Sequence, residues 1–242
     1  MSLQAVTFDF WETLVRTDNA AMHLARRVAV AEVLAANNFP AELNDIEQAF
    51  DEAWSRYSGA WATGEQFTGH HAAELVLDLL GHSPSAEVRR DVIDAYVSAG
   101  RDVELELTYN VADSLRAIKA MDLRIGIICD VGLTPSPILR KVLDRHGVLS
   151  LFDHWSFSDE VGVYKPDPQI FEHALSGLGG IAPSNAVHIG DLRRTDIAGA
   201  IGMGIHSIRY CGANDDPAEN GPEADHVLTD HADLPAYIAS LL

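Results

Sequence analysis

The chain has 242 residues, of which 47% are hydrophobic and 22% are charged, a composition typical of globular proteins. This length fits one large domain, or a core domain that carries a smaller inserted one. The formal net charge of −19 argues against a nucleic-acid partner and against an anionic membrane surface, because both bind to clusters of lysine and arginine.

The cysteines and the apolar segments indicate where the protein works. Cys129 and Cys211 form neither a disulfide framework nor a metal-binding spacing, which predicts a reducing environment and hence the cytoplasm. No segment approaches the ~18 apolar residues of a membrane span. The N-terminus lacks the basic region and cleavage site of a signal peptide, because strand-like sequence begins by Gln4.

Short apolar segments predict the strands of a sheet. After the first of them, the later ones alternate with segments of helical periodicity, which indicates βαβ units and a parallel sheet covered by helices on both faces. The predicted strands are Ala5–Phe8, Arg124–Cys129, His154–Phe157, Ala186–Ile189, Ile205–Arg209 and His226–Leu228. The predicted helices between and after them are Val111–Met121, Pro137–Arg145, Asp167–Leu178, Asp196–Ile201 and a last helix from Leu234.

The segment from residue 16 to residue 103 has helical periods and no convincing strand. Its predicted helices are Ala20–Ala36, Leu43–Tyr57, His71–Leu80 and Ala86–Ala99, and we interpret Ser58-Gly59 as one of the turns between them. We therefore predict an all-helical domain of residues 16–103, inserted into an α/β core formed by residues 1–15 and 104–242.

Four short motifs place reactive side chains at strand ends or before a helix. The end of a parallel strand is where α/β sheets bind their ligands, although a single aspartate there is often only a turn former. Lysine is scarce in this chain, so a lysine directly before a helix is unlike an ordinary surface residue. The motifs are Phe8-Asp9-Phe10-Trp11-Glu12-Thr13-Leu14, Cys129-Asp130-Val131-Gly132, Tyr164-Lys165-Pro166-Asp167 and Gly190-Asp191-Leu192-Arg193-Arg194-Thr195-Asp196.

The last motif has two carboxylates five residues apart. Asp191 ends a strand and Asp196 opens the next helix, which makes a plausible site for a hard cation, although Asp196 could equally be a helix cap. Arg193 and Arg194 lie between these two aspartates in the sequence, and they either attract anions to this site or lie in solvent.

In order and spacing, these four motifs resemble those of the haloacid dehalogenase superfamily. The resemblance extends to the closing segments Gly202-Met203-Gly204 and Ala224-Asp225-His226. It implies a three-layer, Rossmann-like parallel-sheet core, with the helical insertion as a small cap domain. It also implies a hydrolase whose nucleophile is an aspartate.

The resemblance further implies a role for each motif residue. Asp9 is the expected nucleophile, and Lys165 supplies positive charge beside it and beside the substrate. Mg²⁺ is the expected cofactor, with Asp9, Asp191, Asp196 and the backbone carbonyl of Trp11 as its ligands. The expected substrate is a small phosphorylated metabolite, which reacts through an aspartyl phosphate.

Thr13, Cys129, Asp130 and Lys165 are the predicted substrate-binding residues. Two of them depart from the family pattern, which has a serine or threonine and an asparagine where this chain has Cys129 and Asp130. A thiol is a weak hydrogen-bond donor, and a second carboxylate adds negative charge near a phosphate.

Trp11 is the largest departure, because phosphatases of this superfamily have a second aspartate at that position as general acid and base. An indole cannot transfer a proton at neutral pH. An aromatic residue there resembles the haloacid dehalogenases, which need no metal, so metal-independent 2-haloacid dehalogenation is the alternative function. A catalytically degraded, non-enzymatic module is a further alternative. The identity of the substrate and the oligomeric state have no signal in the sequence.

Overall fold

The structure is a computed structural model that describes residues 2–242. The chain forms two compact units. An α/β unit comprises the chain up to Thr17, Leu105–Asp130 and Leu143–Leu242, and a helical unit comprises Asp18–Glu104 and Val131–Val142.

A six-stranded, fully parallel sheet forms the centre of the α/β unit, so the predicted fold class is confirmed. The strand order is β3-β2-β1-β4-β5-β6. The strands are β1 (Ala5–Phe8), β2 (Arg124–Cys129), β3 (His154–Phe157), β4 (Ala186–Gly190), β5 (His206–Tyr210) and β6 (His226–Leu228). In the central strands the side chains on both faces are buried, which explains their continuous apolar sequence.

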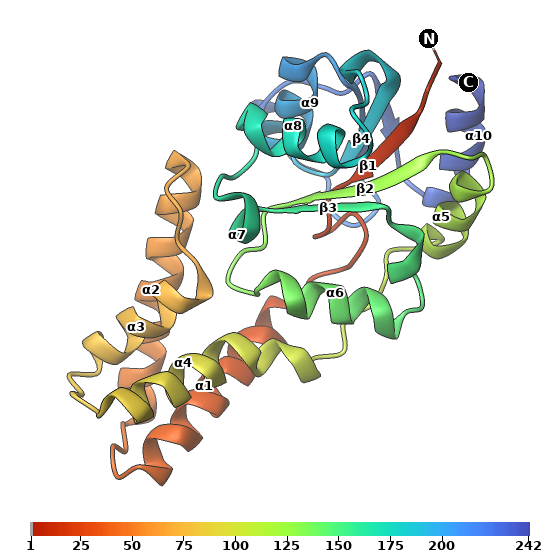
Figure 1. The fold of residues 1–242 in the computed structure, drawn as a ribbon. Coiled ribbons are helices and arrows are strands. Elements are labelled where there is room, and N and C mark those ends of the chain that lie inside the picture. Colours follow the sequence, from red (N-terminus) through yellow and green to blue (C-terminus); the bar gives the residue numbers. More distant parts are fainter. Residues whose placement is uncertain (1) are drawn as a thin grey trace. The chain divides into compact units, whose positions relative to one another are not determined.

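Helices cover the two faces of this sheet (Figure 1). On one face α5 (Val111–Lys119) packs against α10 (Leu234–Ser240), and on the other α8 (Pro168–Gly177) packs against α9 (Ala198–Met203). The core under α8 includes Ile128, Ile170 and Phe171, all fully buried. The unit also contains the single-turn helix α7 (Ser158–Val161).

The register of the sheet brings the functional strand ends together. β1 lies between β2 and β4, and Phe8 pairs with Ile127 on one side and with Ile189 on the other. The residues that follow these strands therefore meet at one edge of the sheet, where α/β folds bind ligands.

Four long helices form the helical unit: α1 (Asn19–Ala36), α2 (Leu43–Thr63), α3 (Gly69–Leu79) and α4 (Ala86–Ser98). The segment Val131–Val142, which includes most of α6 (Ser136–Arg145), belongs to this unit, whereas the sequence places it in the core domain. Two contacts explain this. The buried guanidinium of Arg26 donates to the Thr134 hydroxyl at 2.8 Å, and Gly69 lies so close to the Leu133 carbonyl that a Cβ would be 2.6 Å from it.

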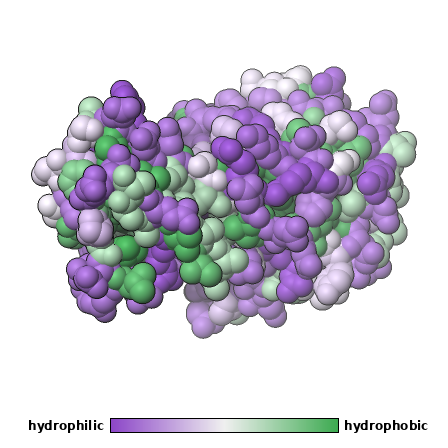
Figure 2. Space-filling view, turned by 90° about the horizontal axis from the view of Figure 1, so that it is seen from below, coloured by the Kyte–Doolittle hydropathy of each residue, from purple (hydrophilic) through white to green (hydrophobic). Residues whose placement is uncertain are grey.

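Hydrophilic side chains dominate the face seen in Figure 2, with small groups of hydrophobic residues between them. This agrees with the strongly acidic composition. Within residues 2–242, no helix is both long and apolar enough to cross a membrane.

Candidate active site

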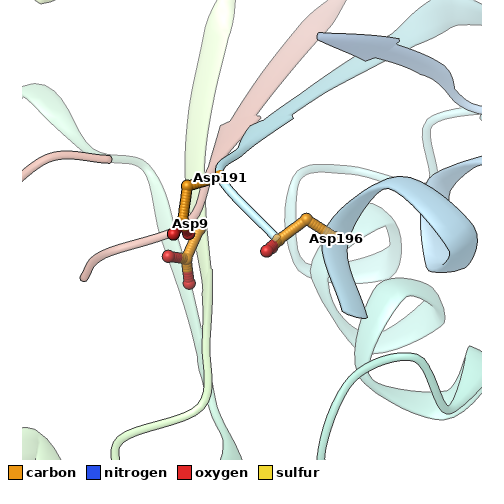
Figure 3. Close-up of side chains that lie close together, drawn as sticks. All are labelled: Asp9, Asp191 and Asp196. Carbon is orange, nitrogen blue, oxygen red and sulfur yellow. The ribbon is translucent and has the colours of Figure 1, made fainter. Parts of the chain in front are cut away.

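Three buried carboxylates meet at the carboxyl edge of the sheet (Figure 3). Asp9 directly follows β1, and Asp191 directly follows β4. Asp196 lies in η4 (Arg193–Ile197), a π-helical turn that leads into α9. One oxygen or more from each carboxylate lies within 4.8 Å of the others. The structure thus brings together the three side chains that the sequence predicts as metal ligands.

The backbone of β4 leaves room for the Asp196 side chain to lie close to the strand end. A Cβ on Gly190 would lie 2.2 Å from the Asp196 carboxyl carbon, so only glycine at this position leaves room for that side chain. Asp196 does not cap a helix: its Oδ2 accepts from the Leu192 backbone N–H at 3.2 Å within the π-helical turn. The predicted helix start at Asp196 is therefore wrong: the π-helical turn begins at Arg193, before Asp196, and α9 begins at Ala198, after it.

Lys165 lies among these carboxylates rather than in solvent. Its Nζ donates to Asp9 Oδ1 at 2.5 Å, to Asp196 Oδ1 at 2.6 Å and to the Ile128 carbonyl at 3.1 Å, and the residue is only 3% exposed. These three bonds use all the donors of the ammonium group. A charged side chain held in this way offers a fixed positive charge next to the Asp9 carboxylate.

His188 contacts the same oxygen of Asp196 that accepts from Lys165. It is fully buried in β4, and its Nε2 lies 3.1 Å from Asp196 Oδ1. Because a carboxylate only accepts, the Nε2–H tautomer donates here, and Nδ1 accepts from the Thr7 hydroxyl at 3.0 Å. Burial lowers the pKa of His188, which keeps the ring neutral.

The site has an excess of negative charge. Asp9, Asp191 and Asp196 face the single ammonium of Lys165, which leaves a formal surplus of two negative charges, equal in size to the charge of one divalent cation. Burial raises the pKa of Asp9 to about 7 despite the attraction of Lys165. Burial, followed by repulsion from Asp9 and Asp196, raises the pKa of Asp191 well above its ordinary value. Although burial opposes it, the charge of Lys165 lowers the pKa of Asp196.

Thr13 has a buried hydroxyl near the nucleophile loop. Its Oγ1 has no hydrogen-bond partner among the described residues, whereas its backbone carbonyl accepts from the Thr108 hydroxyl at 2.6 Å and from His231 Nε2 at 2.9 Å. Because buried hydroxyls are nearly always bonded, this one is suited to an oxygen of a bound ligand. Its predicted role in substrate binding stays a prediction.

Cys129 is the last residue of β2, and Asp130 directly follows the strand. Burial raises the pKa of the Cys129 thiol well above its ordinary value, so the thiol is neutral. Asp130 Oδ1 accepts from the Lys165 backbone N–H at 3.0 Å. Asp130 thus fixes the backbone that carries the lysine, and its predicted contact with substrate stays a prediction.

Trp11 lies on the loop after Asp9, half-buried, with its ring edge-on to Phe10 at a centroid distance of 4.9 Å. Its backbone carbonyl stays a predicted metal ligand. The nearest acid on this loop does not replace the missing aspartate, because the Glu12 carboxylate accepts from the backbone N–H and the hydroxyl of Thr17.

Two residues that contact the site, His188 and Asn214, are not among the site residues predicted from the sequence. His188 has the appearance of an ordinary core histidine in the sequence, and only its place three residues before Asp191 on a predicted strand hints at more. Asn214 Nδ2 donates to Asp191 Oδ2 at 2.8 Å from a polar loop whose sequence gives no signal of a site.

Comparisons with known proteins agree with this arrangement. A family model described as haloacid dehalogenase-like hydrolase matches residues 3–204. The chain is 24% identical over 243 residues to a glyceraldehyde 3-phosphate phosphatase of Methanocaldococcus jannaschii, covering 99% of this chain and 98% of the relative. It is equally 24% identical over 243 residues to (S)-2-haloacid dehalogenase 1 of a Pseudomonas species, with the same coverage.

Among solved structures, the crystal structure of 2-haloacid dehalogenase from Pseudomonas syringae matches with a TM-score of 0.71 at 21% identity, covering 99% of this chain and 100% of that chain. At this identity the match shows the fold alone, and it agrees with the family model. The chain therefore belongs to the haloacid dehalogenase-like hydrolase family, and is a hydrolase whose relatives include both phosphatases and dehalogenases.

Proposed function

We propose that the protein is a Mg²⁺-dependent phosphatase that acts on a small phosphorylated metabolite through an aspartyl phosphate at Asp9. The observation that supports this most is the group of three buried carboxylates, Asp9, Asp191 and Asp196, matched by only one lysine. An enzyme that attacks carbon without a metal has no need for this surplus of negative charge. The phosphatase relative supports the same reaction class.

The residues fit a magnesium ion. Mg²⁺ takes oxygen ligands and keeps several waters, so Asp9, Asp191 and the Trp11 carbonyl are sufficient as protein ligands. Asp196 already accepts from Lys165, His188, Leu192 and Thr195, which fills the acceptor sites of a carboxylate, so we assign it the role of orienting Lys165 and the metal's surroundings. When bound, Mg²⁺ supplies positive charge that reduces repulsion between the nucleophile and an anionic phosphate.

The side chains then divide the chemistry among themselves. Asp9 attacks phosphorus, the bond from phosphorus to the leaving oxygen breaks, and water later hydrolyses the aspartyl phosphate to regenerate the carboxylate. The Lys165 ammonium stabilises charge on the transferring group, and the unpartnered Thr13 hydroxyl donates to one of its oxygens. With Trp11 in place of an acid, the leaving oxygen departs without a proton from this loop.

One observation favours a second function. Trp11 gives the nucleophile loop an aromatic side chain where a phosphatase has an acid, and one relative is a 2-haloacid dehalogenase. In that reaction Asp9 displaces halide from carbon, and water hydrolyses the resulting ester. Lys165 serves there as a fixed charge for the substrate carboxylate, and no metal is needed.

A paired substrate screen separates the two functions. Hydrolysis of p-nitrophenyl phosphate and release of halide from 2-chloropropionate are each measured with Mg²⁺ and with chelator. We expect phosphate release that needs Mg²⁺ and is lost in Asp9→Asn, while Asp91→Asn, an exposed carboxylate of α4, retains it. Halide release that persists in chelator would establish the dehalogenase instead.

A further inference from the structure

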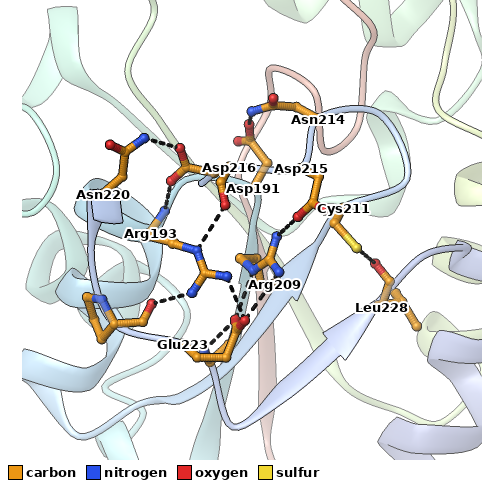
Figure 4. A network of polar contacts seen from close by, with 12 residues as sticks. Asp191, Arg193, Arg209, Cys211, Asn214, Asp215, Asp216, Asn220, Glu223 and Leu228 are labelled. Atoms are coloured by element: carbon orange, nitrogen blue, oxygen red, sulfur yellow. Dashed lines mark hydrogen bonds and ion pairs between the residues drawn. The ribbon is translucent and has the colours of Figure 1, made fainter. Parts of the chain in front are cut away.

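The loop between β5 and β6, residues 211–225, reaches back to the candidate active site. Among the described residues, the side-chain hydrogen bond that joins it to the three carboxylates runs from Asn214 Nδ2 to Asp191 Oδ2 at 2.8 Å. The next two residues are acids, and both are directed onto arginines: Asp215 onto Arg209 at 2.7 Å, and Asp216 onto the backbone N–H of Arg193 at 2.8 Å. The neutral amide is thus the group of this run that meets Asp191 (Figure 4).

Two buried arginines fix this loop through one glutamate. Glu223 accepts from Arg193 Nη2 at 2.7 Å and from Arg209 Nε at 2.8 Å, and both arginines are at most 6% exposed. Arg193 also donates from Nε to the Asp216 carbonyl at 3.0 Å and from Nη1 to the Pro222 carbonyl at 3.3 Å. We call these residues, Arg193, Arg209 and Glu223, the arginine clamp. Its contacts show that the Arg193 side chain holds the loop and does not lie in solvent.

We propose that Asn214 is a positioning residue for the metal ligand Asp191, and that the arginine clamp holds the loop in the place where Asn214 can act. This inference rests on the proposed function. Asp191 is buried beside Asp9 and Asp196, and the N–H donor that binds its Oδ2 fixes the direction of its other oxygen. An amide does this without adding a fourth negative charge to the site.

The arrangement has a measurable consequence. Partners that orient a metal ligand typically change metal affinity by about 10- to 100-fold when they are removed. Asn214→Ala should therefore weaken Mg²⁺ binding by about that factor. Glu223→Gln should weaken it in the same direction by less, although residue 223 touches none of the three carboxylates, because the clamp loses its charge-assisted bonds.

The test is calorimetric titration of each folded variant with MgCl₂ at constant ionic strength, without any substrate. Asn185→Ala is the control for Asn214→Ala, since it also removes an asparagine amide that donates to a side-chain oxygen, that of Gln4 at 3.4 Å, but at the other end of β4. Glu219→Gln is the control for Glu223→Gln, since it removes the same charge from an exposed position of the same loop. The rise in Tm caused by saturating Mg²⁺ is the second readout.

Weaker binding in Asn214→Ala and in Glu223→Gln, with both controls within about twofold of the wild type, supports the proposal. Equal affinity of Asn214→Ala and Asn185→Ala overturns it. If Asn214→Ala does not fold, equal affinity of Glu223→Gln and Glu219→Gln overturns it. Wild-type protein that binds no Mg²⁺ at millimolar concentration overturns the proposed function and this inference together, whereas a wild type that binds and an unchanged Asn214→Ala overturn the inference alone.

Discussion

The buried ammonium of Lys165 allows a prediction that joins stability to pH. Lys165→Met keeps an unbranched side chain of similar length and removes the charge that pairs with Asp9 and Asp196. Removing one partner of a buried ion pair typically costs ~3–5 kcal/mol. In a protein of this size 1 kcal/mol shifts Tm by ~2–4 °C, so we expect a fall on the order of 6–20 °C near neutral pH or above.

The sign of the pH dependence follows from the carboxylates. In the wild type, the low pKa of Asp196 contributes stability at pH values above the ordinary pKa of an aspartate. Without Lys165, buried carboxyls must be protonated in the folded state, and each costs ~1.36 kcal/mol per pH unit above its unfolded pKa. The penalty in Lys165→Met should therefore be about 4 kcal/mol smaller at about pH 5 than at about pH 8, for one such group.

The assay is thermal unfolding followed by circular dichroism at both pH values, in chelator, for wild type and variants. Lys119→Met is the matched control, because Lys119 also lies 2.5 Å from a carboxylate, that of Asp153, but with about a third of each side chain exposed. Exposed pairs contribute only ~0–1 kcal/mol. A Lys165→Met variant that melts within about 2 °C of Lys119→Met at about pH 8 would refute the description of Lys165 as a buried counter-charge.

Three further predictions concern the metal and two of the three departures from the family pattern, Trp11 and Asp130. Mg²⁺ affinity should rise with pH, because binding needs the ionised forms of Asp9, whose pKa is raised to about 7, and of Asp191, whose pKa is also raised; calorimetry should show a fall of about tenfold or more per pH unit below about 7, and affinity that is constant from about pH 5 to 8 would contradict these raised pKa values. Trp11→Asp should raise hydrolysis of alkyl phosphates more than that of aryl phosphates, by up to the ~10²–10⁴ typical of general acid–base catalysis, and a wild type equally fast on both would show that another group supplies the proton. Asp130→Asn should retain turnover, because the amide oxygen still accepts from the Lys165 backbone N–H, whereas Asp130→Ala should lower kcat; equal rates of the two variants would contradict this role.

Much of the sheet could be predicted because its strands are short, apolar and buried on both faces. The predicted bounds of β1, β2, β3 and β6 coincide with those in the structure. β5 begins one residue later than predicted, since the Ile205 N–H donates to the Ala200 carbonyl and closes the end of α9. An apolar residue next to a strand gives no sign in the sequence that its backbone belongs to a helix cap.

Turn residues were less reliable guides than apolar patterns. We predict a turn at Ser58-Gly59, yet α2 continues to Thr63 and ends at Gly64, which has a left-handed φ of 79°. The Ser58 hydroxyl donates to the Trp54 carbonyl within the helix, and Ala60 extends the buried face. Packing of that face offsets the low helix propensity of the two residues.

The residues of the candidate site also differ in whether the sequence could predict them. Asp9, Lys165 and Asp191 could be predicted because each follows a strand or precedes a helix in a spacing that the fold brings to one edge. Asn214 could not be predicted, because its position depends on a loop that Arg193 and Arg209 fix through Glu223. Contacts of this kind depend on the tertiary structure and leave no periodic pattern in the sequence.

The central claim is that Asp9 attacks phosphorus when Mg²⁺ is bound, and a covalent adduct on its carboxylate tests this most directly. The protein is mixed with p-nitrophenyl phosphate, quenched with acid during turnover and digested, and the peptide that contains Asp9 is analysed by mass spectrometry. We predict a phosphorylated Asp9 with Mg²⁺ and none in chelator or in Asp9→Asn. Phosphate turnover without this adduct, or an ester formed on Asp9 from 2-chloropropionate in chelator, would contradict the account.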